Sequence, residues 1–264
     1  MNYNPIRWMR KMKLPIRGLF LELLVVFLGV YLAFYLSNYS EQEKNEAQQV
    51  KIMSSLKIEL EGMRFRFPGY SGYQKNKVAE WKEALSENRV IDYYNYQFIQ
   101  PQYDYHALEY ALQTRETEVV PFDVFQSLLA IQRNVERLRE AEDRMTEVSL
   151  LHRNLPSEYE LSENEQLSRF ADNLFHFSKF IRFAETRAQA LEQLSALALE
   201  ALDFINKELP EQVRHDIEIE LIQDYMGSLN QIPPMEFALP QISKFFPEIP
   251  EGEIEEVLRE YYSR

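Results

Sequence analysis

The chain has 264 residues, with 29 basic and 42 acidic side chains and a formal net charge of −13 at pH 7. It contains no cysteine, which excludes disulfides, thiolate nucleophiles and cysteine-ligated zinc. Only seven residues are glycine, against an average usage of about 7%. The chain therefore has few of the glycines that tight β-turns and phosphate-binding loops need. This composition favours long helices over sheets.

The charge is divided between a basic N-terminus and an acidic remainder. Residues 1–18 contain no acid and five basic residues, namely Arg7, Arg10, Lys11, Lys13 and Arg17. The other 24 of the 29 basic residues face all 42 acids. The basic segment suits an anionic lipid surface, whereas the acidic remainder should repel nucleic acid. We therefore expect membrane lipid as a partner and no nucleic-acid binding.

Residues 19–36 form an apolar stretch with one charge, Glu22. At about 1.5 Å per residue the stretch makes a helix of roughly 27 Å, close to the thickness of a hydrocarbon core. A cleaved signal peptide is the alternative, but residues 34–39 are bulky where a cleavage site needs small residues. We predict an uncleaved anchor over 19–36 after a cytoplasmic segment over 1–18. The positive-inside bias then places the C-terminal domain in the periplasm of a bacterial inner membrane.

A helical neck is predicted over residues 37–67. Residues 41–49 are polar on all sides, and apolar residues then recur at spacings of three and four up to Phe67. Four of them are interpreted as an interaction seam: Met53, Leu56, Leu60 and Met63. Pro68 and Gly69 predict the end of this helix.

Residues 68–228 are predicted to form a helical bundle. A polar helix is expected over 70–90, a tyrosine-rich connector over 91–105 and a short helix over 105–116. The long helix that follows Pro121 has one apolar face, formed by Leu128, Ile131, Val135, Leu138, Ala141, Met145 and Val148. A capping box of Ser162 and Glu165 begins the next helix. Its apolar face is formed by Phe170, Leu174, Phe177, Ile181, Ala184, Ala188 and Leu191.

A shorter helix carries Ile217, Leu221 and Tyr225, and residues 229–264 are predicted as a proline-rich segment followed by an acidic C-terminal helix. Strands have few candidates. The fold class expected is all-α, with one N-terminal transmembrane helix that continues into a helical neck and an extracytoplasmic bundle.

Catalytic and metal-binding patterns are missing from the sequence. The four histidines never occur at a spacing of four residues, and dinucleotide, P-loop and serine-hydrolase motifs are absent. Paired acids occur at Glu59/Glu61, Glu218/Glu220 and Glu255/Glu256. Since these pairs lie in strongly charged segments, we interpret them as solvated helix faces. We expect no enzyme activity, cofactor or metal.

Glu22 lies on one helical face with Val26, Gly29 and Ala33. Gly29 and Ala33 form a small-xxx-small pair, which permits close approach of a second helix. We interpret this face as a membrane packing face in a homo-oligomer or a larger membrane protein complex. An alternative is an ion- or proton-coupled subunit in which Glu22 titrates. A further alternative is a periplasmic sensor or ligand-binding module that uses the region from Tyr93 to Tyr105.

Two segments resemble a known family. They are "GLFLELLVVFLGVYLAFYLSNYSEQEKNEAQQVKIMSSLKIELEGM" and "YHALEYALQTRETEVVPFDVFQSLLAI". Their order and spacing are similar to a Bacteroidetes-type family of single-pass membrane proteins whose domain has no assigned function. Glu22 matches that family's membrane acid, Gly29 and Ala33 its small residues, and Tyr39 replaces its tryptophan. The resemblance implies the single-pass topology and a role for Glu22, without naming a reaction.

Overall fold

The computed structural model describes residues 16–98, 100–101, 105–114, 119–153, 163–228 and 233–263. Within these ranges the protein is all-α and contains no strand. The elements are α1 (Ile16–Ser86), a short 3-10 helix η2 (Tyr93–Asn95), α2 (His106–Gln113), α3 (Phe122–Arg153), α4 (Glu163–Glu208), α5 (Glu211–Ser228), α6 (Met235–Phe245) and α7 (Glu251–Ser263). The predicted all-α class is confirmed.

The chain divides into two compact units, residues 1–48 and residues 49–264. In the first unit, α1 carries an apolar stretch, and α1 is the one described helix that is long and apolar enough to cross a membrane. Residues 49–67, which were predicted to belong to a neck, lie in the second unit. The predicted neck is therefore shorter than expected, because its apolar seam packs within this chain.

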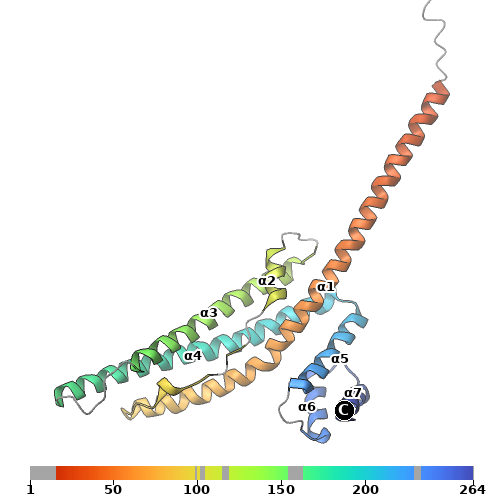
Figure 1. The fold of residues 1–264 in the computed structure, drawn as a ribbon. Coiled ribbons are helices and arrows are strands. Elements are labelled where there is room, and N and C mark those ends of the chain that lie inside the picture. The colour runs from red at the N-terminus through yellow and green to blue at the C-terminus, as the bar shows by residue number, and fades with distance from the viewer. Residues whose placement is uncertain are drawn as a thin grey trace, which may run out of the picture. The chain divides into compact units, whose positions relative to one another are not determined.

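Three long helices form the core of the second unit: the part of α1 after residue 48, α3 and α4 (Figure 1). Three pairs fix the register of α1 and α4, namely Ser71 with Ala188, Gln74 with Arg187, and Lys82 with Glu185. Two further pairs fix the register of α3 and α4, namely Arg137 with Gln193 and Glu142 with Arg187. In each set the residue numbers rise along one helix and fall along the other. Both α1 and α3 are thus antiparallel to α4 and parallel to each other.

The predicted apolar face of α3 is confirmed. Its seven residues, Leu128 to Val148, are all buried. The predicted face of α4 is confirmed only from Phe177 onward, because Phe170 is 45% exposed. Lys82 pairs with Glu185, and α1 ends one turn later at Ser86. The first part of α4 therefore extends beyond the end of α1 and is not covered by that helix.

The predicted end of the helix at Pro68 and Gly69 is wrong, because α1 continues through both residues to Ser86. A proline inside a helix costs about 3 kcal/mol through a lost hydrogen bond and a steric clash. Buried side chains on both sides of Pro68 offset this cost, among them Phe67 and Gln74. Packing against the rest of the chain outweighs the local preference here. The helix expected over 70–90 is therefore the last part of α1.

The connector between α1 and α3 runs back along the bundle. Because α1 and α3 are parallel, the chain must return from the end of α1 to the level at which α3 begins. At Ala107 it lies beside Glu59, to which the Ala107 N–H group donates a hydrogen bond. That position is about 40 Å of helix from Ser86. The tyrosine-rich residues at the start of the connector pack on the core: the Tyr93 ring stacks on Phe177 at 5.3 Å, and the Tyr96 ring meets Trp81 edge-on at 4.8 Å.

A buried ion pair joins the three core helices. Arg187 of α4 and Glu142 of α3 are 2% and 3% exposed, and Arg187 Nε donates to the Glu142 carboxylate at 2.8 Å. Arg187 Nη1 also donates to Gln74 Oε1 of α1 at 3.0 Å. The guanidinium lies 4.7 Å from the ring centroid of Phe98, which places an aromatic face over the cation.

A second buried charge joins α1 to α4 and α5. Lys57 is fully buried and donates to Glu218 at 2.6 Å and to Asn206 at 2.8 Å. Glu61 is buried beside it, and this burial raises the pKa of the Glu61 carboxyl while Arg64 and Lys57 oppose the rise. The interpretation of Glu61 and Glu218 as solvated acids is wrong, because cations from the same and neighbouring helices allow both to be buried.

Helices α5, α6 and α7 pack around a separate apolar cluster that includes Ile222, Ile242 and Leu258. The predicted proline-rich segment contains α6, which the sequence analysis missed, although Pro240 lies inside that helix.

His215 of α5 faces Glu253 of α7, with Nε2 and Oε1 3.0 Å apart. The predicted capping residue Ser162 lies outside the described residues.

Replacing Arg187 by Met should lower the free energy of unfolding by about 3–5 kcal/mol, because it leaves Glu142 buried without its cation. The double variant Arg187→Met/Glu142→Met should recover most of this loss. Thermal and denaturant unfolding followed by circular dichroism measure both. Arg144→Met, which breaks an exposed ion pair with Glu147, is the control and should change nothing measurable. A double variant as unstable as Arg187→Met would contradict the conclusion that an unpaired Glu142 causes the loss of stability.

The stability of the protein should depend on the charge of His215. The hydrogen bond to Glu253 raises the pKa of His215 above its usual 6.5, and Asp216 and Glu218 add to the effect. Because the folded-state pKa is the higher one, this stabilisation is complete below pH 6.5 and is lost as the pH rises through the folded-state value. The melting temperature should therefore fall more between pH 5.5 and 8.5 in the wild type than in His215→Gln or Glu253→Gln. Equal pH dependence in all three would contradict this.

Candidate functional site

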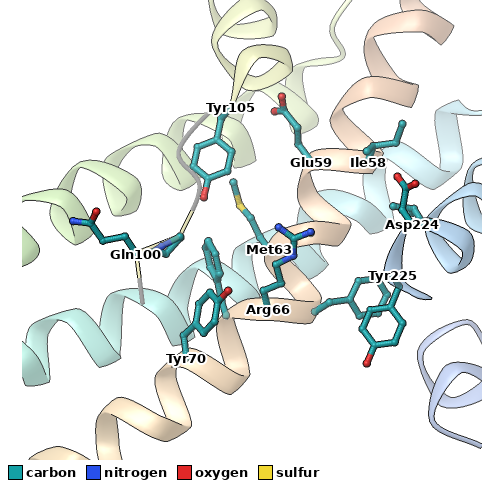
Figure 2. Close-up of a pocket in the computed structure, with 14 residues that line it drawn as sticks. Ile58, Glu59, Met63, Arg66, Tyr70, Gln100, Tyr105, Asp224 and Tyr225 are labelled. Atoms are coloured by element: carbon teal, nitrogen blue, oxygen red, sulfur yellow. The ribbon is translucent and has the colours of Figure 1, made fainter. Parts of the chain in front are cut away.

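A cleft of about 800 Å³ lies over one face of α1 in the second unit (Figure 2). One wall comes from α5 and the other from the end of the connector, at the start of α2. The polar residues that line it are Glu59, Arg66, Tyr70, Gln100, Tyr105, Asp224 and Tyr225. The apolar residues include Ile58, Met63, Phe67, Pro101 and Leu221. The cleft thus combines an apolar floor with charged and phenolic side chains.

One face of α1 lines the cleft at a four-residue spacing, through Ile58, Gly62, Arg66 and Tyr70. Residues at this spacing lie above one another on one side of a helix. Gly62 has no side chain to project from the middle of this face, and a Cβ added there would meet no atom within 4 Å. No contact within the described chain therefore requires glycine at this position.

Glu59 fixes the connector wall. Its two carboxylate oxygens accept hydrogen bonds from the backbone N–H groups of Ala107 at 2.7 Å and Leu108 at 3.0 Å. These groups lie in the first turn of α2, where helical N–H groups have no partner within the helix. Burial raises the pKa of Glu59, and the two backbone hydrogen bonds oppose the rise. Glu59 therefore acts as a helix cap supplied by another helix, and it holds Tyr105 beside the cleft.

Two charged groups that line the cleft have no ionic partner. Among the described residues, no opposite charge lies within ion-pair distance of Arg66 or Asp224, and both are exposed. In Figure 2, Arg66 projects from α1 into the space between the Tyr105 wall and the Tyr225 wall. Asp224 lies on the α5 side. The free cation is therefore central to the cleft, and the free carboxylate is at one edge.

The lining of the cleft offers groups that can orient a ligand. Burial raises the pKa of Tyr105, so its phenol stays neutral at physiological pH. The described residues contain no group of acids and histidines arranged to hold a metal ion. The lining offers one guanidinium, phenol hydroxyls and apolar contacts, which can orient a ligand.

The predicted interaction seam is not available to a partner. Met53, Leu56, Leu60 and Met63 are at most 1% exposed and lie in the same apolar core as α3 and α4. The periodicity correctly marked an apolar face, but the helices that cover it come from this chain. Sequence spacing does not distinguish a packing partner in the same chain from one in another.

The predicted membrane face lies in the first unit. Glu22, Val26, Gly29 and Ala33 are exposed, and a Cβ added at Gly29 would meet no atom within 4 Å. The structure brings none of these residues into the cleft. The alternative ligand region from Tyr93 to Tyr105 is divided: Tyr93 is buried in the core. Gln100, Pro101 and Tyr105 line the cleft.

The sequence analysis missed Gly62, Arg66, Asp224 and the buried cations Lys57 and Arg187. A signal existed for the first two, because Ile58, Gly62, Arg66 and Tyr70 recur every four residues beside the apolar seam. Asp224 carries no local signal, since it meets the cleft only through the packing of α5.

Comparison with protein-family models, curated proteins and solved structures finds no match to this chain. The resemblance to a Bacteroidetes-type membrane family therefore stays a prediction. The function has to be argued from the geometry and chemistry of the chain itself.

Removing the carboxylate of Glu59 should destabilise α2. Glu59→Ala should lower the free energy of unfolding by about 1–2 kcal/mol, the usual cost of losing a helix cap. Glu59→Gln, which keeps one acceptor oxygen, should lose less. Hydrogen exchange at Ala107 and Leu108 should accelerate in Glu59→Ala. Glu136→Ala, at an exposed position of α3, is the control, and equal exchange in both variants would contradict the capping role.

Proposed function

We propose that this chain is a single-pass inner-membrane protein with a cytoplasmic N-terminus and a periplasmic helical domain. It acts without catalysis, as a structural or accessory subunit that associates with itself or with a larger membrane complex. The apolar stretch of α1 carries this proposal. Every residue from 22 to 39 is exposed, including Phe27 at 70% and Phe34 at 67%.

The energetics favour a membrane as the cover for this stretch. A large apolar side chain that is fully buried contributes about 1.5–3 kcal/mol, and most residues from Leu23 to Leu36 are of this kind. One charged residue near the centre of a spanning helix costs about 2.5–3.5 kcal/mol on insertion scales. The burial of two or three of the apolar side chains therefore offsets the cost of inserting the Glu22 charge. The basic residues before the stretch support the cytoplasmic N-terminus.

Self-association or complex formation is supported by the Glu22, Val26, Gly29 and Ala33 face. Without a hydrophobic driving force in lipid, helices associate through close packing at small residues and through polar contacts. Gly29 supplies such a site, because no part of the described chain occupies the space beside it. Glu22 at one end adds a polar group to the same face.

An ion- or proton-coupled subunit is the second candidate. A carboxylate inside a membrane span is costly and is by default a functional candidate. Glu22 is the one charged residue in the apolar stretch. In this reading Glu22 titrates inside an oligomer or beside a channel partner, and the packing face serves to position it.

Gly29→Leu should weaken assembly at least tenfold, because the added side chain fills the space needed by a second helix. Light scattering after size exclusion in mild detergent, together with copurification from native membranes, measures assembly. Leu24→Phe adds bulk on the opposite helical face and should leave assembly unchanged. An unaltered oligomer or complex in Gly29→Leu would count against this face.

Glu22→Gln separates the two candidates. Loss of assembly in this variant favours the packing role. Intact assembly with loss of proton flux, measured in proteoliposomes that contain the copurified complex and a pH-sensitive dye, favours the coupled subunit.

A further inference from the structure

We propose that the cleft over α1 binds an amphiphilic anion, a small molecule with an aromatic or aliphatic body and one carboxylate or phosphate group that pairs with Arg66. The proposal goes beyond the membrane role described above. The cleft belongs entirely to residues 49–264, and its test needs no assembly, so either proposal can fail without the other.

The charge of the cleft favours a single anionic group. Arg66 is the one cation that lines the cleft among the described residues, and it has no carboxylate partner there. Among the described residues Glu59 forms no ion pair with Arg66, and its two oxygens accept the backbone hydrogen bonds of α2. A guanidinium binds carboxylate or phosphate through two parallel hydrogen bonds. Asp224 at the α5 edge would repel a second anionic group.

The floor and walls favour an apolar body. The core residues Met63 and Phe67 and the buried Pro101 line the cleft, and Leu221 and the Tyr225 ring continue the apolar lining onto α5. The volume of about 800 Å³ lies in the range of roughly 300–1,000 Å³ that is typical of small-molecule sites. Tyr70 and Tyr105 lie on the same side of Arg66 (Figure 2) and add ring faces and phenol hydroxyls.

Gly62 keeps the path between the apolar floor and Arg66 open. Glycine inside a helix costs about 1 kcal/mol relative to alanine, and no neighbour within 4 Å requires its small size. A larger side chain at position 62 would stand between Ile58 and Arg66, in the space assigned to the ligand. Because an added Cβ meets no atom there, we expect Gly62→Leu to keep the fold.

Binding is tested with the full chain in phosphatidylcholine nanodiscs by calorimetric titration with 2-naphthoate and 2-naphthyl phosphate. Empty nanodiscs give the blank, and 2-naphthylmethanol is the neutral probe. We expect one saturable site per chain for at least one anion and at least tenfold weaker binding of the alcohol. Arg66→Gln should weaken anion binding at least tenfold, and Gly62→Leu should abolish it.

Two variants serve as matched controls. Arg133→Gln removes an exposed arginine of α3, and Gly69→Leu enlarges an open glycine of α1 outside the cleft lining. Both should bind like the wild type, and all four variants should keep the wild-type circular dichroism spectrum. Absence of saturable binding to both anions overturns the proposal, as does binding that survives Arg66→Gln or Gly62→Leu.

A further comparison identifies the source of the anion. If phosphatidylglycerol in the nanodisc abolishes naphthoate binding, the site takes a lipid headgroup. If binding is unchanged, it takes a soluble molecule. Both results support the site, because Arg66 and Gly62 are required in each.

Discussion

The contact between the Arg187 guanidinium and the Glu142 carboxylate determines how the long helices align. Both groups are removed from water, so each needs the other at hydrogen-bond distance, and Gln74 of α1 completes the arrangement. A shift of one helix by a single turn, about 5.4 Å, would leave a buried charge without its partner. The apolar faces alone would tolerate such a shift far better. The polar contact therefore selects one register from several that bury similar apolar area.

This register has consequences for the cleft. Because α1 and α3 are parallel, the chain must return along the bundle between them, and the returning segment ends where Glu59 caps α2. That cap places Tyr105 at one side of the exposed face of α1. On the other side, Lys57 holds α5 through Glu218, which brings Asp224 and Tyr225 to the opposite wall. The cleft is thus the space between two elements that buried or capping carboxylates attach to the same helix.

Apolar periodicity predicted much of the fold, because a face such as Leu128 to Val148 reports burial directly. It failed at Pro68 and in the segment that contains α6, where local helix-breaking residues are outweighed by packing that no short window reveals. Charged residues gave the other errors: Glu61 was interpreted as solvated, and Lys57 and Arg187 were not singled out, yet all three are buried. The cleft could not be predicted, since Arg66, Tyr105 and Asp224 meet only after helices far apart in the sequence have packed.

The pairing of α1 with α4 also affects the order of folding. Ser71 and its acceptor Ala188 are 117 residues apart in the chain, and at about 5–20 residues per second the ribosome needs on the order of ten seconds to make the intervening segment. During that interval the apolar seam of α1 lacks its neighbours on α4, and the Lys57 ammonium lacks its partners Asn206 and Glu218. The α3 and α4 pair, whose contacts are closer in sequence, can form first and receive α1 afterwards. Part of the apolar face of α1 therefore stays uncovered until α4 has been made.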